Sequence, residues 1–186
     1  KIVSVNNNIQ DRKYYSVLSE LPPSQTNELP SDWTFETDAF TNGIGSWGAQ
    51  TSVVNDGSAP EGSYYGKVIP TVIGEYWDGG IFDPVSVVSN QEYTLSFYAK
   101  TNTSGRNVTV LINGDITTGW ANRGLFEVVP LTNGWQYFSY TFLATATDPL
   151  ANFYFEFGED PGEVHIDNVI LSQNSTPPPA PISILS

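Results

Sequence analysis

The chain of 186 residues has no cysteine and no methionine, and only 7 of its residues are lysine or arginine. The absence of cysteine excludes disulfide bonds and thiolate metal sites. With 20 acidic residues the net charge is -13, which disfavours binding to the phosphate backbone of nucleic acids and to anionic membrane surfaces. No apolar stretch approaches the ~20 residues needed to cross a bilayer, so we expect no membrane insertion.

Aromatic residues are abundant, at 13% of the chain, while charged residues make up only 15%. The polar surface must therefore come from serine, threonine, asparagine, glutamine and glycine, a mixture that favours strands and turns over helices. The length suits one domain with tails. For such an acidic protein a neutral ligand is the natural partner, and clustered carboxylates could also hold calcium.

Proline-rich stretches divide the chain into three parts. Pro22, Pro23 and Pro30 interrupt regular structure near the beginning. We predict that residues 1–30 form an N-terminal extension or the end of a preceding module, that 31–173 form the compact domain, and that 174–186 form an extended linker. The linker suggests a module covalently joined to other domains, which we expect to be monomeric.

Between these tails, hydrophobic residues recur with a period of two. The pattern predicts strands at 33–37, 64–72, 93–100, 107–114, 135–144, 151–158 and 163–171. Turn residues separate the strands, so we predict an all-β protein with an antiparallel β-sandwich. The strand at 151–158 turns one face inward with Phe153, Phe155 and Phe157, and the other outward with Asn152, Tyr154 and Glu156. The outward set could bind a ligand, or Tyr154 could simply cover the sheet.

From Trp33 to Leu171, five segments follow a familiar order: WTFETD, EGSYYGKV, NQEYTLSFYAK, NGWQYFSYTFLAT and GEVHIDNVILS. This order resembles carbohydrate-binding modules of families 4, 9, 16 and 22. These are calcium-binding β-sandwich jelly rolls attached to polysaccharide-degrading enzymes or to glycan-capturing surface proteins. The resemblance implies a secreted, extracellular or cell-surface module, of bacterial origin, that binds a polysaccharide without catalysis.

The resemblance also implies a structural calcium site. Its ligands would be Glu36, Glu61, a main-chain carbonyl near Tyr64, and Asp167. Calcium prefers six to eight oxygen ligands from carboxylates and carbonyls, which these residues could supply. Asp167 interrupts an apolar strand, and a partly buried carboxylate there needs a partner. The alternative partner is a hydrogen bond from the backbone or from a tyrosine hydroxyl.

The stretch GEYWDGG places Tyr76 and Trp77 between glycines, with Glu75 beside them. In the resembled families, a stacking tryptophan lies close to this position, and sugar binds in a cleft across one sheet or at the rim of the sandwich. We therefore interpret Trp77 as a platform for a sugar ring, with Tyr76 or Glu75 alongside. The alternative is a rim residue that covers the core, because tryptophans are usually largely buried.

Further candidates lie in turn-like surroundings or on predicted outward faces. Trp120 lies near Gly119 and Gly124, with two polar neighbours whose side chains could hydrogen-bond sugar hydroxyls. Trp47 also lies among glycines, although a family tryptophan near there is often structural. The additional ligand-binding candidates are Asn122, Arg123, Tyr98, Asn113, Tyr154 and Glu156. Trp33 and Trp135 are assigned to packing.

Two other classes of function compete with a binding module. A structural or adhesive spacer would share the core pattern but would have no reason to expose glycine-flanked tryptophans. A glycoside-active jelly roll would need a pair of carboxylates, and the compact acid triad of such enzymes, E-x-D-x-x-E, does not occur. The only histidine, His165, alternates with Ile166 and so faces outward on a strand, which disfavours a Ser–His–Asp arrangement. The sequence therefore predicts a non-catalytic module for a neutral polysaccharide, a β-glucan or xylan.

Overall fold

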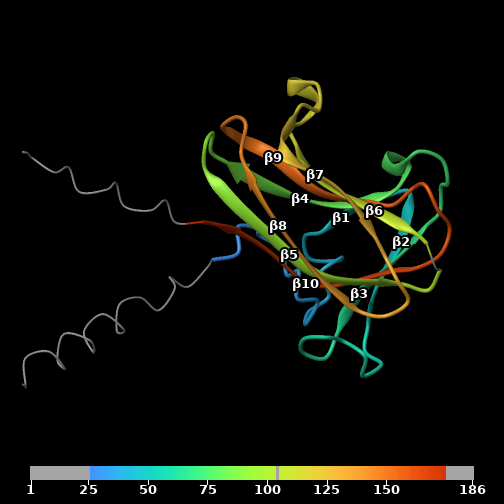
Figure 1. The fold of residues 1–186 in the computed structure, drawn as a ribbon. Coiled ribbons are helices and arrows are strands. Elements are labelled where there is room, and N and C mark those ends of the chain that lie inside the picture. Colours follow the sequence, from blue (N-terminus) through green and yellow to red (C-terminus); the bar gives the residue numbers. More distant parts are fainter. Residues whose placement is uncertain (1–25, 104, 175–186) are drawn as a thin grey trace, which may run out of the picture.

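The computed structural model describes residues 26–103 and 105–174. In these ranges the chain forms two five-stranded antiparallel sheets that pack face to face, with two short 3-10 turns and no α-helix (Figure 1). The predicted all-β sandwich of the jelly-roll type is confirmed. Within the same ranges, no helix is both long and apolar enough to span a membrane.

The strand order places elements distant in sequence side by side. The first sheet has the order β1 (Gly45–Trp47), β4 (Gly80–Val87), β9 (Asp148–Glu156), β6 (Asn107–Asn113), β7 (Asn122–Pro130). The second sheet has the order β2 (Ala49–Val54), β3 (Tyr65–Pro70), β10 (Val164–Gln173), β5 (Glu92–Thr101), β8 (Gln136–Leu143). The 3-10 turns are η1 (Tyr76–Asp78) before β4 and η2 (Ile116–Thr118) between β6 and β7.

Aromatic side chains fill the space between the sheets. Phe155 of β9 lies edge-to-face with Phe97 of β5, with ring centroids 4.9 Å apart, and so connects the two sheets. Phe153 lies 5.4 Å from Trp33, again edge-to-face. These rings are fully buried, and edge-to-face pairs of this kind add to the stabilisation from burial. The predicted inward alternation of 151–158 is confirmed.

The predicted strand at 33–37 is wrong, although its aromatic residues do enter the core. Trp33 lies in a turn, and Phe35, just after that turn, lies in irregular structure with a positive φ of 60°. The indole Nε1 of Trp33 donates a hydrogen bond to Oδ2 of the buried Asp83 at 2.8 Å. Burial raises the pKa of Asp83, and the hydrogen bonds from Trp33 and Ser31 oppose that rise. This segment is therefore held by a side-chain contact to β4 instead of a strand ladder.

Six of the predicted strands overlap β3, β5, β6, β8, β9 and β10, and the sequence pattern missed β1, β2, β4 and β7. The pattern missed β4 because it contains Asp83 and Pro84, two residue types that are disfavoured in strands. Proline is tolerated in a strand where its nitrogen has no ladder partner. The neighbouring β1 pairs only with residues 80–82 of β4, so the β1 side of β4 is unpaired at Pro84.

The sandwich also includes residues that we assigned to the N-terminal extension. Asn27 donates from Nδ2 to the carbonyl of Val169 at 3.1 Å, and its Oδ1 accepts from the backbone N–H of Leu171 at 3.0 Å. Leu29 is buried in the core. Among the described residues, Asn27 and Glu28 thus form hydrogen bonds with β10. Residues 1–25 and 175–186 of the two predicted flanking segments lie outside the described residues.

Candidate functional site

The outer face of the first sheet carries a groove of about 920 Å³. Ligand sites are typically concave, mostly apolar and of ~300–1,000 Å³. Strand register brings one apolar row across the floor, because Tyr154 of β9 pairs with both Phe82 of β4 and Leu111 of β6. Leu111 in turn pairs with the exposed Phe126 of β7. The groove is lined by Trp47, Tyr76, Trp77, Phe82, Leu111, Asn113, Asp115, Ile116, Trp120, Asn152, Tyr154 and Glu156.

Two glycines make room for the rings on this floor. A Cβ on Gly80 would lie 2.1 Å from the indole of Trp47, and a Cβ on Gly45 would lie 2.3 Å from the ring of Phe82. Without those Cβ atoms, Trp47 lies across β4 and meets Tyr154 edge-to-face at 5.9 Å. The glycines next to these aromatics therefore allow side chains of β1 and β4 to lie flat on the sheet.

The turn η1 carries one exposed indole to the groove. Trp77 is 50% exposed, and Tyr76 lies edge-to-face with it at 4.6 Å. The turn is fixed by the backbone, since the carbonyl of Trp77 accepts a hydrogen bond from the Trp47 indole at 2.9 Å and the carbonyl of Tyr76 accepts one from the N–H of Gly158 at 2.9 Å. The half-exposed ring of Trp77 is thus held in place by its main chain, while its face remains open.

The loop around η2 carries a second exposed indole. Trp120 is 53% exposed and adopts a positive φ of 59°. Asp115 caps the turn, because its Oδ1 accepts from the backbone N–H of Thr117 at 2.9 Å. The carbonyl of Asp115 also accepts from the N–H of Trp120 at 3.1 Å. The cap at Asp115 therefore sets the position of the Trp120 ring beside the groove.

Besides the phenol hydroxyls and indole N–H groups of its aromatic residues, the groove is lined by two amide and two carboxyl side chains. Asn113 and Asn152 are cross-strand partners on β6 and β9, and the Nδ2 of Asn122 supports Asn113 by donating to its Oδ1 at 3.1 Å. Asp115 lies at the η2 side. Glu156 is 7% exposed, and its Oε2 is buried without a hydrogen-bond partner. Burial raises the pKa of Glu156 to about 7.

The structure brings most of the predicted ligand residues together. Seven of them line the groove: Trp77, Tyr76, Trp120, Trp47, Asn113, Tyr154 and Glu156. Tyr154 is also largely buried between Phe82 and Trp47 and covers the sheet there, while its contact with a ligand stays a prediction. Glu75 is exposed beside η1 and is not among the groove-lining residues.

Three other predicted ligand residues do not line the groove. Arg123 is buried, and its Nη2 lies 2.7 Å from Oδ2 of Asp148 in an ion pair. Asn122 lies behind Asn113 and donates to the carbonyl of Leu125. Tyr98 lies on the second sheet, where its ring meets that of Tyr137 at 5.2 Å. Because Nε and Nη2 of Arg123 both bond Asp148, the guanidinium is not available for paired hydrogen bonds with sugar hydroxyls.

Phe82, Leu111, Asp115 and Ile116 line the groove but were not predicted from the sequence. For Phe82 a signal exists, because residues 80–87 alternate in burial once the strand is known. Leu111 looks like a core residue in its strand, since β6 is buried on both faces. Ile116 is 75% exposed, and nothing in its local sequence marks it as a groove residue.

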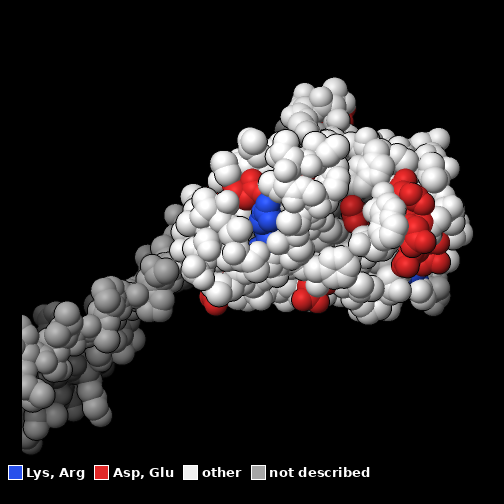
Figure 2. All heavy atoms as spheres, turned by 90° about the horizontal axis from the view of Figure 1, so that it is seen from above, with Lys and Arg blue, Asp and Glu red and all other residues white. Residues whose placement is uncertain are grey.

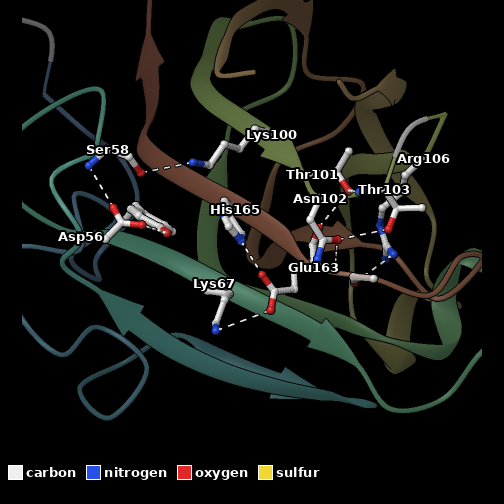
Figure 3. A network of polar contacts seen from close by, with 12 residues as sticks. Asp56, Ser58, Lys67, Lys100, Thr101, Asn102, Thr103, Arg106, Glu163 and His165 are labelled. Atoms are coloured by element: carbon white, nitrogen blue, oxygen red, sulfur yellow. Dashed lines mark hydrogen bonds and ion pairs between the residues drawn. The ribbon is translucent and has the colours of Figure 1, made fainter. Parts of the chain in front are cut away.

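The outer face of the second sheet carries part of a network of polar contacts (Figure 3). His165 lies there, with Nε2 3.0 Å from Oε2 of Glu163. Lys67 reaches the same carboxylate at 3.7 Å. Trp135 packs on this face as well, with the ammonium of Lys100 4.6 Å from its ring centroid. Burial lowers the pKa of His165. Within the described residues, His165 contacts Glu163 and stacks on Tyr65, which are packing contacts of the sheet surface.

The predicted calcium residues come from segments that meet in space. The Oδ2 of Asp167 accepts from the backbone N–H of Glu61 at 3.1 Å, and Oε1 of Glu36 accepts from the backbone N–H groups of Ser63 and Tyr64 at 2.7 and 3.0 Å. Burial, together with the charges of Glu36 and Glu61, raises the pKa of Asp167 to about 6. Among residues 26–103 and 105–174, no group of three acidic, histidine or cysteine side chains is placed to hold a metal ion.

The two-sheet fold and the open aromatic groove on one sheet are the features expected of a β-sandwich module that binds a ligand. Residues 6–162 match the model of a family described as a carbohydrate binding domain, of the CBM 4/9 type. The match covers more than half of the chain, and the protein belongs to this family. No curated protein matches the chain.

Solved structures of similar modules have the same fold. A structure titled "CBM4 structure and function" is 24% identical, with a TM-score of 0.62, and the match covers 76% of this chain and 97% of that one. The second N-terminal cellulose-binding domain of a β-1,4-glucanase from Cellulomonas fimi is 24% identical, with a TM-score of 0.58, covering 82% and 97%. A xylan-binding CBM22 domain from Paenibacillus barcinonensis is 14% identical, with a TM-score of 0.59, covering 83% and 99%. At these identities the likeness shows the fold alone.

The exposure of the groove indoles can be tested by fluorescence quenching with acrylamide, a neutral quencher. We expect Trp77→Phe and Trp120→Phe each to lower the quenchable fraction of the emission, because half of each side chain is exposed. Trp33→Phe is the control and should raise that fraction, because it removes the emission of an indole that is only 1% exposed. If the two groove variants behave like the Trp33 variant, the indoles are covered in solution.

Proposed function

We propose that the protein is a non-catalytic module that binds a neutral polysaccharide, a β-linked glucan or xylan, along the groove of the first sheet. The observation that carries this proposal is the pair of half-exposed indoles, Trp77 and Trp120, that border one aromatic floor. Pyranose rings present apolar C–H faces that stack on indole. The nearby amides of Asn113 and Asn152 can both donate and accept hydrogen bonds, as sugar hydroxyls require.

The electrostatics support an uncharged ligand. The groove lining contains two acidic side chains and no basic one. Figure 2 shows acidic side chains gathered in a band at one end of a face that is otherwise mostly uncharged. A neutral glycan meets no repulsion there. Two similar modules, one described as cellulose-binding and one as xylan-binding, support a β-linked glucan or xylan as the class of ligand.

A module of this kind would act by keeping a parent enzyme or surface protein near its substrate. Attachment raises the effective concentration of the partner domain at the polysaccharide. We propose a secreted, extracellular protein that works as a monomer joined to other domains through the proline-rich stretch 174–186. A single open groove should bind with an affinity of about micromolar to millimolar, roughly -4 to -8 kcal/mol.

Trp77→Ala tests the groove directly. Removing a central aromatic contact typically costs about 2 kcal/mol, so we expect roughly 30-fold weaker binding of soluble xylo- or cello-oligosaccharides, with an unchanged fold by circular dichroism. Isothermal titration calorimetry measures the affinity. The matched control is Tyr137→Ala, because Tyr137 is an aromatic residue that is at least as exposed, at 59% against 50% for Trp77, but lies on the second sheet. Equal losses in both variants would contradict the groove, and release of reducing sugar would contradict a non-catalytic role.

We also propose a structural calcium ion near Glu36, Glu61 and Asp167. The three carboxylates come from segments that meet in space, and the negative charges of Glu36 and Glu61 disfavour the ionised form of Asp167. A divalent cation bound by carboxylate oxygens would offset this repulsion. Among the described residues, no three acidic, histidine or cysteine side chains are close enough together to hold a metal ion. Backbone carbonyls such as that of Tyr64, and water, would therefore have to complete the ligand set.

Calcium removal should therefore lower the melting temperature. An ion at 100 times its Kd stabilises the native state by ~2.7 kcal/mol, which corresponds to a shift of roughly 5 to 10 °C for a domain of this size. Differential scanning calorimetry with EDTA and with added calcium measures it. Glu36→Gln should melt at the same temperature in both conditions. An identical melt of the wild-type protein with and without chelator would remove the calcium proposal.

A further inference from the structure

The groove floor contains one carboxyl with no charge partner. Glu156 is the last residue of β9, where it pairs with Gly80 of β4 and Thr109 of β6. Its side chain lines the groove, is more than nine-tenths buried, and leaves Oε2 without a hydrogen-bond partner. A buried polar group in this state is costly. Within the described ranges no other acidic side chain has a buried oxygen without a partner, which points to a functional use.

The groups that face Glu156 cannot neutralise it. Burial raises the pKa of the phenols of Tyr76 in η1 and Tyr154 in β9, and the nearby charge of Glu156 raises both further. Glu75 and Glu159 act on Tyr76 in the same sense, and Asp115 on Tyr154. The partners of Glu156 on β4 and β6 are uncharged. Every titratable neighbour is therefore an acid or a phenol.

Each lysine and arginine in residues 26–103 and 105–174 has a partner other than Glu156. Lys67 pairs with Glu163, Lys100 covers Trp135, and Arg123 pairs with Asp148. Arg106 is buried and donates to backbone carbonyls, including that of Phe157 at 2.7 Å. None of these four lines the groove. The charge on Glu156 is thus opposed by burial alone, and burial raises its pKa to about 7.

A bound neutral glycan would remove the remaining water from this carboxyl. Further desolvation disfavours the carboxylate and favours the carboxylic acid. The acid form can donate one hydrogen bond to a sugar oxygen and accept another. The pKa of Glu156 should therefore be higher in the complex than in the free protein, so that complex formation takes up a proton from solvent. A uronic acid would bring a second negative charge to the same uncompensated site.

We propose that Glu156 is a specificity-determining residue of the groove: the groove binds neutral glycans with a net uptake of protons by the Glu156 carboxyl, less than one per ligand, and rejects glycans that carry uronic acid at that position. This inference rests on the proposed function, because it names the charge and protonation state that the same groove requires. The direction of the pH dependence follows: affinity for a neutral oligosaccharide is highest below pH 7 and falls as the pH rises through 7.

The test is isothermal titration calorimetry with a neutral xylo- or cello-hexaose at pH 5.5 and pH 8.5. If binding raises the pKa of Glu156 by one unit, the affinity at pH 8.5 is about five- to tenfold weaker. At pH 7 the reaction takes up roughly 0.4 proton, which appears as a dependence of the measured enthalpy on the ionisation enthalpy of the buffer. A hexaose that carries a glucuronate branch should bind more weakly than its neutral parent.

Glu156→Gln keeps the size of the side chain and cannot ionise, so its affinity should be independent of pH and of buffer. The matched control is Glu159→Gln, which removes the same charge from an exposed position just after β9 and should keep the wild-type pH profile. In the free protein, the carboxyl carbon of Glu156 should titrate near pH 7 by NMR. A midpoint at the ordinary value for glutamate overturns the inference whatever the ligand does.

The outcomes separate this inference from the function on which it rests. Wild-type binding that is flat with pH, or tighter at pH 8.5, overturns the role of Glu156 and leaves the glycan-binding proposal in place. An absence of binding to neutral glycans at every pH overturns the proposed function itself, and this inference with it.

Discussion

The alternation of side chains along β9 connects the core of this protein to its groove. Phe153 and Phe155 point inward and meet each other edge-to-face at 5.2 Å, while Asn152, Tyr154 and Glu156 point outward into the groove. Because the side-chain period of a strand is two, a one-residue slip would bury the polar set and expose the phenylalanines. The packing that stabilises the sandwich therefore also fixes which groups a ligand meets.

The same reasoning explains why the groove can leave indoles exposed without loss of fold. The core is closed by rings from β5 and β9 and from the turn at Trp33, so Trp77 and Trp120 are not needed to cover it. Their positions are set by backbone hydrogen bonds of η1 and of the η2 loop. A binding surface held by its main chain needs little reordering when a ligand arrives, which lowers the entropic cost of binding.

Much of the fold follows from local pattern, because apolar residues at every second position give a strand one face that can be buried in the core, and six of the predicted strands are present. The segment at 33–37 carries the same pattern and is not a strand, since the hydrogen bond from Trp33 to Asp83 joins residues 50 positions apart. Likewise β4 is concealed by Asp83 and Pro84, whose buried and edge positions depend on neighbouring strands. Such contacts between distant parts of the chain are not readable from sequence composition.

The site divides in the same way. Trp47, Tyr76, Trp77 and Trp120 lie near glycines in the sequence, and all four line the groove. Arg123 looked equally suitable, but its partner Asp148 lies 25 residues away in sequence, and the resulting ion pair removes it from the groove. The buried state of Glu156 depends on β4, β6 and η1 together, so only the folded arrangement reveals it.

The central claim is that sugar lies on the outer face of the first sheet. The most direct measurement is a titration of the isotopically labelled protein with a neutral xylo- or cello-hexaose, followed by amide and indole NMR shifts. The account predicts that the largest changes occur at the Trp77 and Trp120 indoles and along β6 and β9, with Tyr98 and Tyr137 on the second sheet unaffected. Changes concentrated on the second sheet, or spread without regard to the groove, would contradict it.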